Sequence, residues 1–292
     1  MEHHPYFDLW LHSTQELTAR LGIEIVDRNT LHEWPLSCVQ LLHLADGSQK
    51  IYKSQLRATT VEPEFYSAAC KGDAQLPSGY RSCLPQSTLL ETMQNSVGMV
   101  IEYINVPNLD RMQLTDTEIV EHGNRLLSAM HQFPADFPAY IDISSRAKWS
   151  AYVDETLSML QKLIISDQFH LTTIATNQKL VEWSNSDAIL AAVQAPFILN
   201  HGDLTGDNIF VTAEGYKIID WQRPVRGPAG LDLAKYYYAM GLEPLKYIHH
   251  SLVKMNWFLH LRWFVECKLH WFPSGDTYDR QVAELVDSIL NC

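Results

Sequence analysis

The feature that most constrains this 292-residue chain is a polar loop between short apolar segments in its C-terminal half. The loop reads HGDLTGDN over residues 201–208, and a further polar residue, Asp220, follows after an expected hairpin. Three expected strands surround these residues, at 197–199, 209–211 and 216–219. Because a chain that returns through a hairpin brings its two ends to one edge, the pattern predicts Asp203, Asn208 and Asp220 at one rim.

Such a rim suits phosphoryl transfer, which needs a proton acceptor near the attacking hydroxyl and hard oxygen ligands for Mg²⁺. The sequence predicts Asp203 as the base and Asn208 and Asp220 as the metal ligands. Taken alone, an aspartate such as Asp203 in a loop is as readily a turn residue. The combination of three oxygen donors with this strand context favours the catalytic interpretation.

The segments HGDLTGDNIF (201–210), IIDW (218–221) and GPAGLDLA (227–234) together resemble the catalytic signature of the aminoglycoside phosphotransferase and choline kinase family, distant relatives of protein kinases. The resemblance implies that Asp203 receives or orients the substrate hydroxyl proton and that Asn208 and Asp220 hold Mg²⁺. It also implies that His201 shapes the loop. Asp232 is expected to cap the next helix or to brace the loop.

The expected fold class is α+β, a protein-kinase-like bilobal fold with a β-rich N-lobe and a mostly helical C-lobe. Residues 1–104 are expected to form the nucleotide-binding lobe and to end in the hinge, and residues 105–292 the catalytic and acceptor-binding lobe. The expected strands of the first lobe lie at 23–25, 38–44, 50–54 and 98–104. The expected helices lie at 6–21, 61–70, 149–163 and 180–193, with a helical period from Thr115 onward.

A cation for the nucleotide phosphates is expected in the N-terminal lobe, and Lys53, at the end of a predicted strand, is the best placed. The family resemblance gives this lysine the α/β-phosphate role and gives a helix glutamate the task of orienting its ammonium. We expect that partner to be Glu64, with Glu62 as the alternative. The alternative interpretation of Lys53 is an ordinary exposed strand lysine.

The resemblance also implies a hinge over residues 100–104, where backbone groups of Glu102, Tyr103 and Ile104 would meet the adenine edge. One departure from the fuller kinase pattern is that residues 27–37, expected to connect the first two strands, contain no glycine. A flexible glycine-rich loop over the phosphates is therefore absent. The expected nucleotide is ATP, with GTP as the alternative.

Composition excludes several other classes. With 22 Lys+Arg against 34 Asp+Glu, the net charge of -12 argues against binding to nucleic acid backbones. The five cysteines show no paired spacing and are typical of reduced cytosolic thiols. No signal peptide and no long uninterrupted apolar run are evident, so the expectation is a cytoplasmic protein without a membrane segment. The oligomeric state is left open.

The acceptor is expected to be a small molecule with a hydroxyl group, and a cationic amine is one candidate. Negative charge at Glu266, Asp276 and Asp279 would suit an amine. Nearby aromatic residues are most simply helix core and otherwise a pocket wall that stacks on a sugar or cages an amine. These residues are Trp257, Phe258, Trp263, Phe264, Trp271 and Phe272.

The sequence thus predicts an ATP- and Mg²⁺-dependent kinase that transfers the γ-phosphoryl group to an alcohol hydroxyl of a small metabolite, amino alcohol, sugar or aminoglycoside. The alternative is a catalytically silent nucleotide-binding or scaffold protein on the same fold, which only the glycine-free segment favours. A metal-dependent phosphohydrolase with His201 and Asp203 as ligands would need further His or Asp motifs, which the chain lacks.

Overall fold

The computed structural model describes residues 1–71 and 79–291 and divides into two compact units. The first unit contains Met1–Leu114, Gln132–Tyr140 and Thr205–Pro224. The second contains Thr115–His131, Ile141–Leu204 and the chain from Val225 onward.

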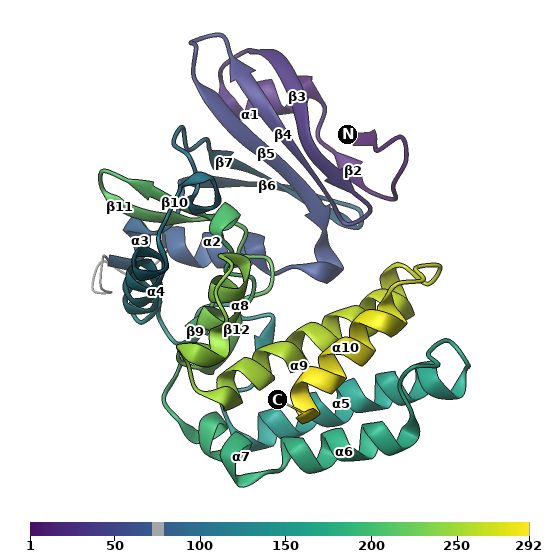
Figure 1. Ribbon diagram of the computed structural model, residues 1–292. Coiled ribbons are helices and arrows are strands. Elements are labelled where there is room, and N and C mark those ends of the chain that lie inside the picture. The colour runs from purple at the N-terminus through teal and green to yellow at the C-terminus, as the bar shows by residue number, and fades with distance from the viewer. Residues whose placement is uncertain (72–78, 292) are drawn as a thin grey trace. The chain divides into compact units, whose positions relative to one another are not determined.

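The first unit contains a five-stranded antiparallel sheet in the order β3-β4-β5-β7-β6 (Figure 1). Its strands are β3 (Ile25–Trp34), β4 (Ser37–Leu44), β5 (Gln49–Leu56), β6 (Ser87–Met93) and β7 (Ser96–Glu102). The predicted turn between β4 and β5 is confirmed: the Ser48 N–H donates to the Asp46 carboxylate at 2.9 Å, and Gly47 has a positive φ of 82°. Glycine adopts this left-handed conformation without strain.

The expected connecting segment at 27–37 is mostly strand. β3 runs from Ile25 to Trp34 and pairs with β4 through a short turn, with Trp34 opposite Ser37. The prediction ended this strand too early because seven of the ten residues of β3 are exposed, which removes the apolar alternation that marks a strand in sequence. The glycine-free segment therefore forms an edge strand and a tight turn.

The expected opening helix at 6–21 is shorter in the structure, where α1 spans Thr14–Leu21. Ser13 and Glu16 form a capping box that starts the helix at this point. The preceding residues form β2 (Trp10–Leu11), which pairs with β1 (Glu2–His3). Leu9, Leu11 and Leu17 pack into one core with β4 and β5.

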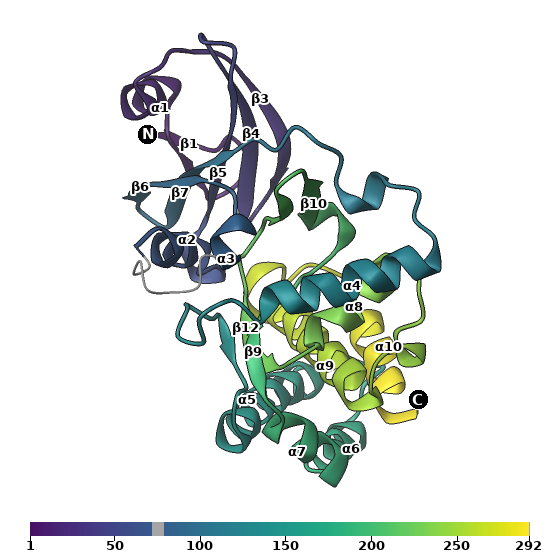
Figure 2. The ribbon, with the colours of Figure 1, turned by 90° about the vertical axis from the view of Figure 1, so that its left-hand side faces the viewer.

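The remaining elements of the first unit include α2, which packs against β6 and β7 (Figure 2). They are η1 (Arg57–Thr59), α2 (Glu62–Lys71), α3 (Gly79–Ser82), η2 (Leu109–Arg111), η3 (Gly206–Asn208), β10 (Ile209–Thr212) and β11 (Gly215–Ile218). The hairpin of β10 and β11 belongs to this unit, since the Ile218 N–H donates to Cys83 O at 2.8 Å. Trp221 stacks on Phe65 of α2 with ring centroids 4.4 Å apart. The contacts thus group 205–224 with the N-terminal sheet, while the lobe boundary at residue 104 stays a prediction.

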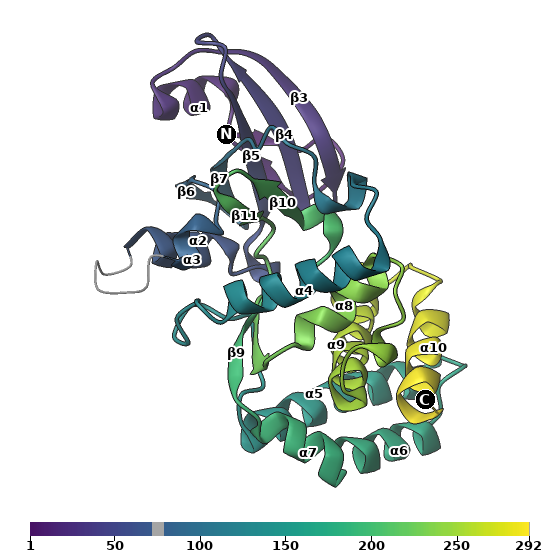
Figure 3. The ribbon, with the colours of Figure 1, turned by 60° about the vertical axis from the view of Figure 1, so that its left-hand side comes forward.

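The second unit is mostly helical, and Figure 3 shows α9 and α10 side by side near α5, α6 and α7. Its helices are α4 (Asp116–Met130), α5 (Arg146–Ile165), α6 (Ile174–Ser184), α7 (Asp187–Gln194), α8 (Leu231–Ala239), η4 (Pro244–Lys246), α9 (His250–Glu266), the π-helical turn η5 (Cys267–Trp271) and α10 (Tyr278–Asn291). A small sheet in the order β8-β12-β9 joins Ile141–Asp142, Val225–Pro228 and Phe197–Asn200. The expected helix at 180–193 is two helices, because Asn185 and Ser186 cap adjoining ends.

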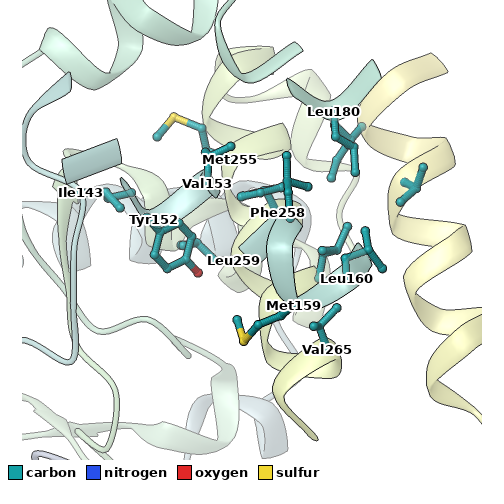
Figure 4. Close-up of a cluster of buried hydrophobic side chains, with 14 of the residues drawn as sticks. Ile143, Tyr152, Val153, Met159, Leu160, Leu180, Met255, Phe258, Leu259 and Val265 are labelled. Atoms are coloured by element: carbon teal, nitrogen blue, oxygen red, sulfur yellow. The ribbon is translucent and has the colours of Figure 1, made fainter. Parts of the chain in front are cut away.

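The core of the second unit gathers apolar side chains from α5, α6, α7, α9 and α10 (Figure 4). Phe258 is fully buried there, with its ring centroid 5.7 Å from that of Trp149. Trp257 and Phe264 pack against the same cluster. For these three members of the aromatic group, the interpretation as helix core is therefore confirmed.

Asp142 connects the small sheet to α5 in this unit. Its carboxylate accepts hydrogen bonds from Arg226 at 2.7 Å and Lys148 at 2.8 Å, and also from Ser144. Although burial opposes the charge, these hydrogen bonds hold the pKa of Asp142 well below its usual value. The ionised carboxylate therefore stabilises the fold above the ordinary pKa of aspartate, and this contribution is lost as the pH falls through the lowered pKa.

Asp142→Asn is expected to reduce the free energy of unfolding by about 1–2 kcal/mol near neutral pH, because charge-assisted hydrogen bonds are replaced by weaker ones. The difference from wild type should shrink in strongly acidic solution, where the wild-type carboxyl also becomes neutral. Chemical denaturation across pH measures both effects. Asp154→Asn on the exposed face of α5 is the matched control. A pH-independent loss would contradict the electrostatic origin.

Cys38, Cys70, Cys83 and Cys267 are free thiols, and Cys292 lies outside the described residues. None of the helices in the described ranges combines the length and hydropathy that a bilayer crossing requires.

Candidate functional site

A buried charged triad joins β5, α2 and the segment after β11 within the first unit. The Lys53 ammonium lies 2.6 Å from Glu62 Oε2 and also donates to Asp220 Oδ1. The Lys53 and Glu62 side chains are 7% and 0% exposed, whereas that of Asp220 is 33% exposed. The triad therefore presents one carboxylate to the surface and holds the lysine beneath it.

The charges of the triad depend on one another. Burial opposes the charge of Lys53, but Asp220 and Glu62 together raise the pKa of its ammonium above the usual value. Burial raises the pKa of Glu62, and Lys53 opposes this shift. Removing the lysine would leave two carboxylates in an environment that disfavours their ionisation.

The expected pairing of Lys53 with Glu64 is wrong. Glu62, the alternative, forms the pair, while the Glu64 side chain is exposed. The apolar spacing of α2 contains the signal: Phe65, Tyr66 and Ala69 are buried at three, four and seven residues after Glu62, which places Glu62 on the buried face. Glu64 lies off that face.

Asn208 and Asp220 are brought together by the β10–β11 hairpin, as the sequence predicts for these two residues. Ile209 pairs with Ile218, and the Ile219 N–H donates to the backbone oxygen of Asn208 at 3.0 Å. Asp220 has a positive φ of 69°, which is uncommon for a residue with a side chain. Such backbone conformations cluster at functional sites.

These two side chains fit a hard divalent cation. The Asn208 amide nitrogen donates to Thr205 Oγ1 at 3.2 Å, so the amide oxygen is the atom that points away from Thr205. The partly exposed Asp220 supplies carboxylate oxygens. Amide and carboxylate oxygens are ligands that Mg²⁺ accepts, and the metal usually takes only one or two protein ligands alongside phosphates and water.

Asp203 belongs to the second unit, where the loop that carries it is braced from α8. The buried Asp232 carboxylate accepts hydrogen bonds from the His201 N–H and, at 2.8 Å, from the Gly202 N–H. The Asp203 N–H donates to His201 Nδ1 at 3.3 Å. Of the two roles expected for Asp232, the structure therefore shows the brace. Burial raises the pKa of Asp232, while His201 and the backbone donors oppose this shift.

Lys235 of α8 is a neighbour of Asp203 that the sequence argument missed. Its Nζ lies 3.4 Å from Asp203 Oδ1, and the two side chains are 26% and 46% exposed. Lys235 follows Asp232 by three residues, and helical residues three apart share a face. Once Asp232 is assigned to the loop, this spacing points to Lys235.

The expected hinge lies at the end of β7. Glu102 is the last residue of this strand, and its N–H donates to Gln86 O at 2.8 Å. Tyr103 and Ile104 follow without regular secondary structure and are partly buried. The backbone N–H of Glu102 is therefore bonded to Gln86, while its backbone oxygen and the backbone groups of Tyr103 and Ile104 remain the candidates for contact with a nucleotide base.

Comparison with protein-family models matches residues 55–247, more than half of the chain, to the phosphotransferase enzyme family. The matched range begins two residues after Lys53 and contains Glu62 and the whole segment from His201 to Asp220. Comparison with curated protein sequences gives no significant match.

Solved structures of phosphotransferases share the fold across nearly the whole chain. A type I macrolide 2'-phosphotransferase is 14% identical with a TM-score of 0.61, and the match covers 97% of this chain and 99% of that one. A choline/ethanolamine kinase family protein from Mesorhizobium loti is 15% identical with a TM-score of 0.59, covering 91% and 88%. A spectinomycin phosphotransferase in complex with ADP and spectinomycin is 14% identical with a TM-score of 0.54, covering 97% and 99%.

These matches confirm the expected fold class, an α+β fold of the kinase-like phosphotransferases with a β-sheet in the N-terminal region and helices in the C-terminal region. They also agree with the family resemblance of the loop and hairpin motifs.

Proposed function

Because the chain belongs to the phosphotransferase enzyme family, we propose that it is a small-molecule kinase that transfers the γ-phosphoryl group of ATP to an alcohol hydroxyl. The observation that carries this proposal is the buried triad of Lys53, Glu62 and Asp220, beside which the hairpin places Asn208. One carboxylate is enough to neutralise the buried lysine, so the triad carries an excess negative charge. That charge would suit a divalent cation, and the lysine ammonium would suit an anionic ligand bound together with the cation.

In this proposal Lys53 contacts the nucleotide phosphates, and Glu62 holds the ammonium in place from the buried side. Asn208 and Asp220 would hold Mg²⁺, which supplies positive charge against the phosphate oxygens. The ADP bound to the spectinomycin phosphotransferase supports nucleotide use on this fold. We propose ATP as the donor, with GTP as the alternative, and backbone groups of Glu102, Tyr103 and Ile104 as the contacts of the base.

Asp203 accepts or orients the proton of the attacking hydroxyl. The brace from Asp232 to the backbone of His201 and Gly202 fixes the loop so that the carboxylate is positioned before the acceptor arrives. Asp203 is therefore the catalytic residue of the proposed reaction, and Asp232 is a positioning residue.

Variants of two glutamates on α2 test whether Glu62 or Glu64 orients the Lys53 ammonium. Glu62→Gln is expected to lower kcat/KM for ATP by about 10–100-fold, because Lys53 loses the charge that orients its ammonium. Glu64→Gln is expected to leave kcat/KM within about twofold of wild type, since that side chain is exposed on the same helix. Steady-state kinetics with melting temperatures for both variants measures the contrast. Equal losses would contradict the proposed role of Glu62.

An ATP-consumption assay with Mg²⁺ across sugars, polyols, amino alcohols and aminoglycosides tests the function as a whole. We expect turnover that depends on one class of hydroxyl acceptor and on the divalent cation. Tight ATP binding with no turnover on any acceptor would instead favour the catalytically silent nucleotide-binding protein, and absence of nucleotide binding would contradict the proposal.

A further inference from the structure

The ion pair between Lys235 and Asp203 places a positive charge beside the residue proposed to meet the acceptor hydroxyl. The distance from Nζ to Oδ1 is 3.4 Å, and both side chains remain partly exposed. Helix α8 and the loop are also connected through the buried Asp232, whose carboxylate bonds to the loop backbone. The lysine therefore belongs to a helix whose backbone is fixed against the loop that carries Asp203.

We propose that Lys235 selects an uncharged polyhydroxyl acceptor, such as a sugar or a polyol, over a cationic amine. This inference rests on the proposed kinase function and specifies its substrate class. A lone carboxylate would attract an amine near the reacting hydroxyl, whereas a carboxylate paired with an ammonium presents little net charge to it. A second ammonium brought by the acceptor would also meet Lys235 as a like charge.

Two of the three acidic residues that could have attracted an amine are engaged by other groups. Glu266 pairs with Arg262 at 2.6 Å, and Arg262 also contacts Glu155 at 2.7 Å. The Asp279 carboxylate accepts the backbone N–H of His170 at 2.8 Å. Two of the three carboxylates expected to form a negative rim are therefore engaged in holding helices and loops together.

An exposed aromatic ring on α8 fits the same class of acceptor. Tyr238 follows Lys235 by three residues, so the two side chains share a face of the helix. The Tyr238 residue is 72% exposed, which is high for a large aromatic residue. An aromatic ring beside hydrogen-bonding groups suits a sugar, because it can cover the apolar C–H face while the polar groups bind the hydroxyls.

The test compares acceptors that differ only in charge, using an amino sugar and the sugar that carries a hydroxyl in place of its amine. Wild type is expected to prefer the uncharged sugar by at least about tenfold in kcat/KM. Lys235→Gln should reduce this preference, and Lys235→Glu should reverse it in favour of the amine. Lys235→Arg should retain the wild-type order, since it keeps the charge.

Lys246→Gln is the matched control, because Lys246 follows α8 in the same unit and forms an exposed pair with Glu243. Melting temperatures separate loss of fold from loss of selectivity, and Lys235→Gln covers the case in which Lys235→Glu fails to fold. A wild-type preference for the amine, or an unchanged ratio in both variants, would overturn the inference.

Different results would contradict the role of Lys235 and the proposed kinase function. Binding of the two sugars, followed by saturation-transfer NMR in the presence of a non-hydrolysable ATP analogue, reports the charge preference without turnover. Preference for the uncharged sugar together with no phosphoryl transfer to any acceptor would contradict the kinase function and retain the binding site. Transfer that favours the amine would retain the kinase function and overturn only the role of Lys235.

Discussion

Asp203→Asn is expected to lower kcat for phosphoryl transfer by about 10³-fold, with the KM for ATP and the melting temperature close to wild type. Asparagine keeps the size of the side chain but cannot accept the hydroxyl proton at neutral pH. The loop should remain in place, because the brace is made by Asp232 to the backbone of His201 and Gly202 and does not involve the Asp203 carboxylate. Steady-state kinetic assays with the best acceptor measure the decrease in kcat.

Asp207→Asn provides the control for this variant. Asp207 lies in the same stretch of loop and accepts a hydrogen bond from Thr205 Oγ1 at 2.5 Å, so its replacement tests general damage to the loop. We expect kcat within a few-fold of wild type for this control. Near-wild-type turnover by Asp203→Asn would remove Asp203 from the catalytic role, whereas equal losses in both variants would indicate a structural effect.

Lys53→Met is expected to have the largest combined effect, abolishing measurable transfer and lowering the free energy of unfolding by about 3–5 kcal/mol. Breaking a buried ion pair leaves its partners as uncompensated charges, and here Glu62 is fully buried. The loss of activity follows from the absence of a cation at the nucleotide phosphates. Denaturation and nucleotide titration measure the two effects separately.

The pH dependence of that loss identifies its cause. In Lys53→Met, the pKa of Glu62, which burial already raises, should rise further because the ammonium that opposes the shift is gone. A carboxyl group whose folded pKa is raised costs stability when it ionises, so the deficit should shrink as the solution is taken from about pH 8 to about pH 5. Lys53→Arg, which keeps the charge, should show a much smaller deficit. A deficit that is independent of pH would indicate lost packing.

Local sequence signals predicted the elements that surround the site. The Asp46-Gly47 turn, the strands next to it and the hairpin that brings Asn208 to Asp220 are all present. Their success has a common reason: turn residues and short apolar strands act over a few positions, so the sequence contains the information locally. The brace formed by Asp232 was likewise expected, although only the structure decides between a brace and a helix cap.

The sequence predictions were wrong or incomplete where tertiary contacts determine the length of a strand or the partner of a side chain. β3 is longer than predicted because its exposed side chains give no periodic pattern, and its length follows from pairing with β4. The choice between Glu62 and Glu64 depends on which face of α2 packs against the sheet. The spacing of the apolar residues in α2 identifies that face only when the position of the helix on the sheet is known. Lys235 lies 32 positions after Asp203 in the chain, so its contact with Asp203 can be inferred only once Asp232 is known to brace the loop.

The most direct test of the central claim is phosphorus NMR of the wild-type protein with ATP, Mg²⁺ and a mixture of uncharged and amino sugars. We expect ADP to form together with an equal amount of a new phosphate monoester, and neither product to form in Asp203→Asn. ATP that stays intact, or that yields only inorganic phosphate at the same rate in both proteins, would contradict phosphoryl transfer to a hydroxyl acceptor.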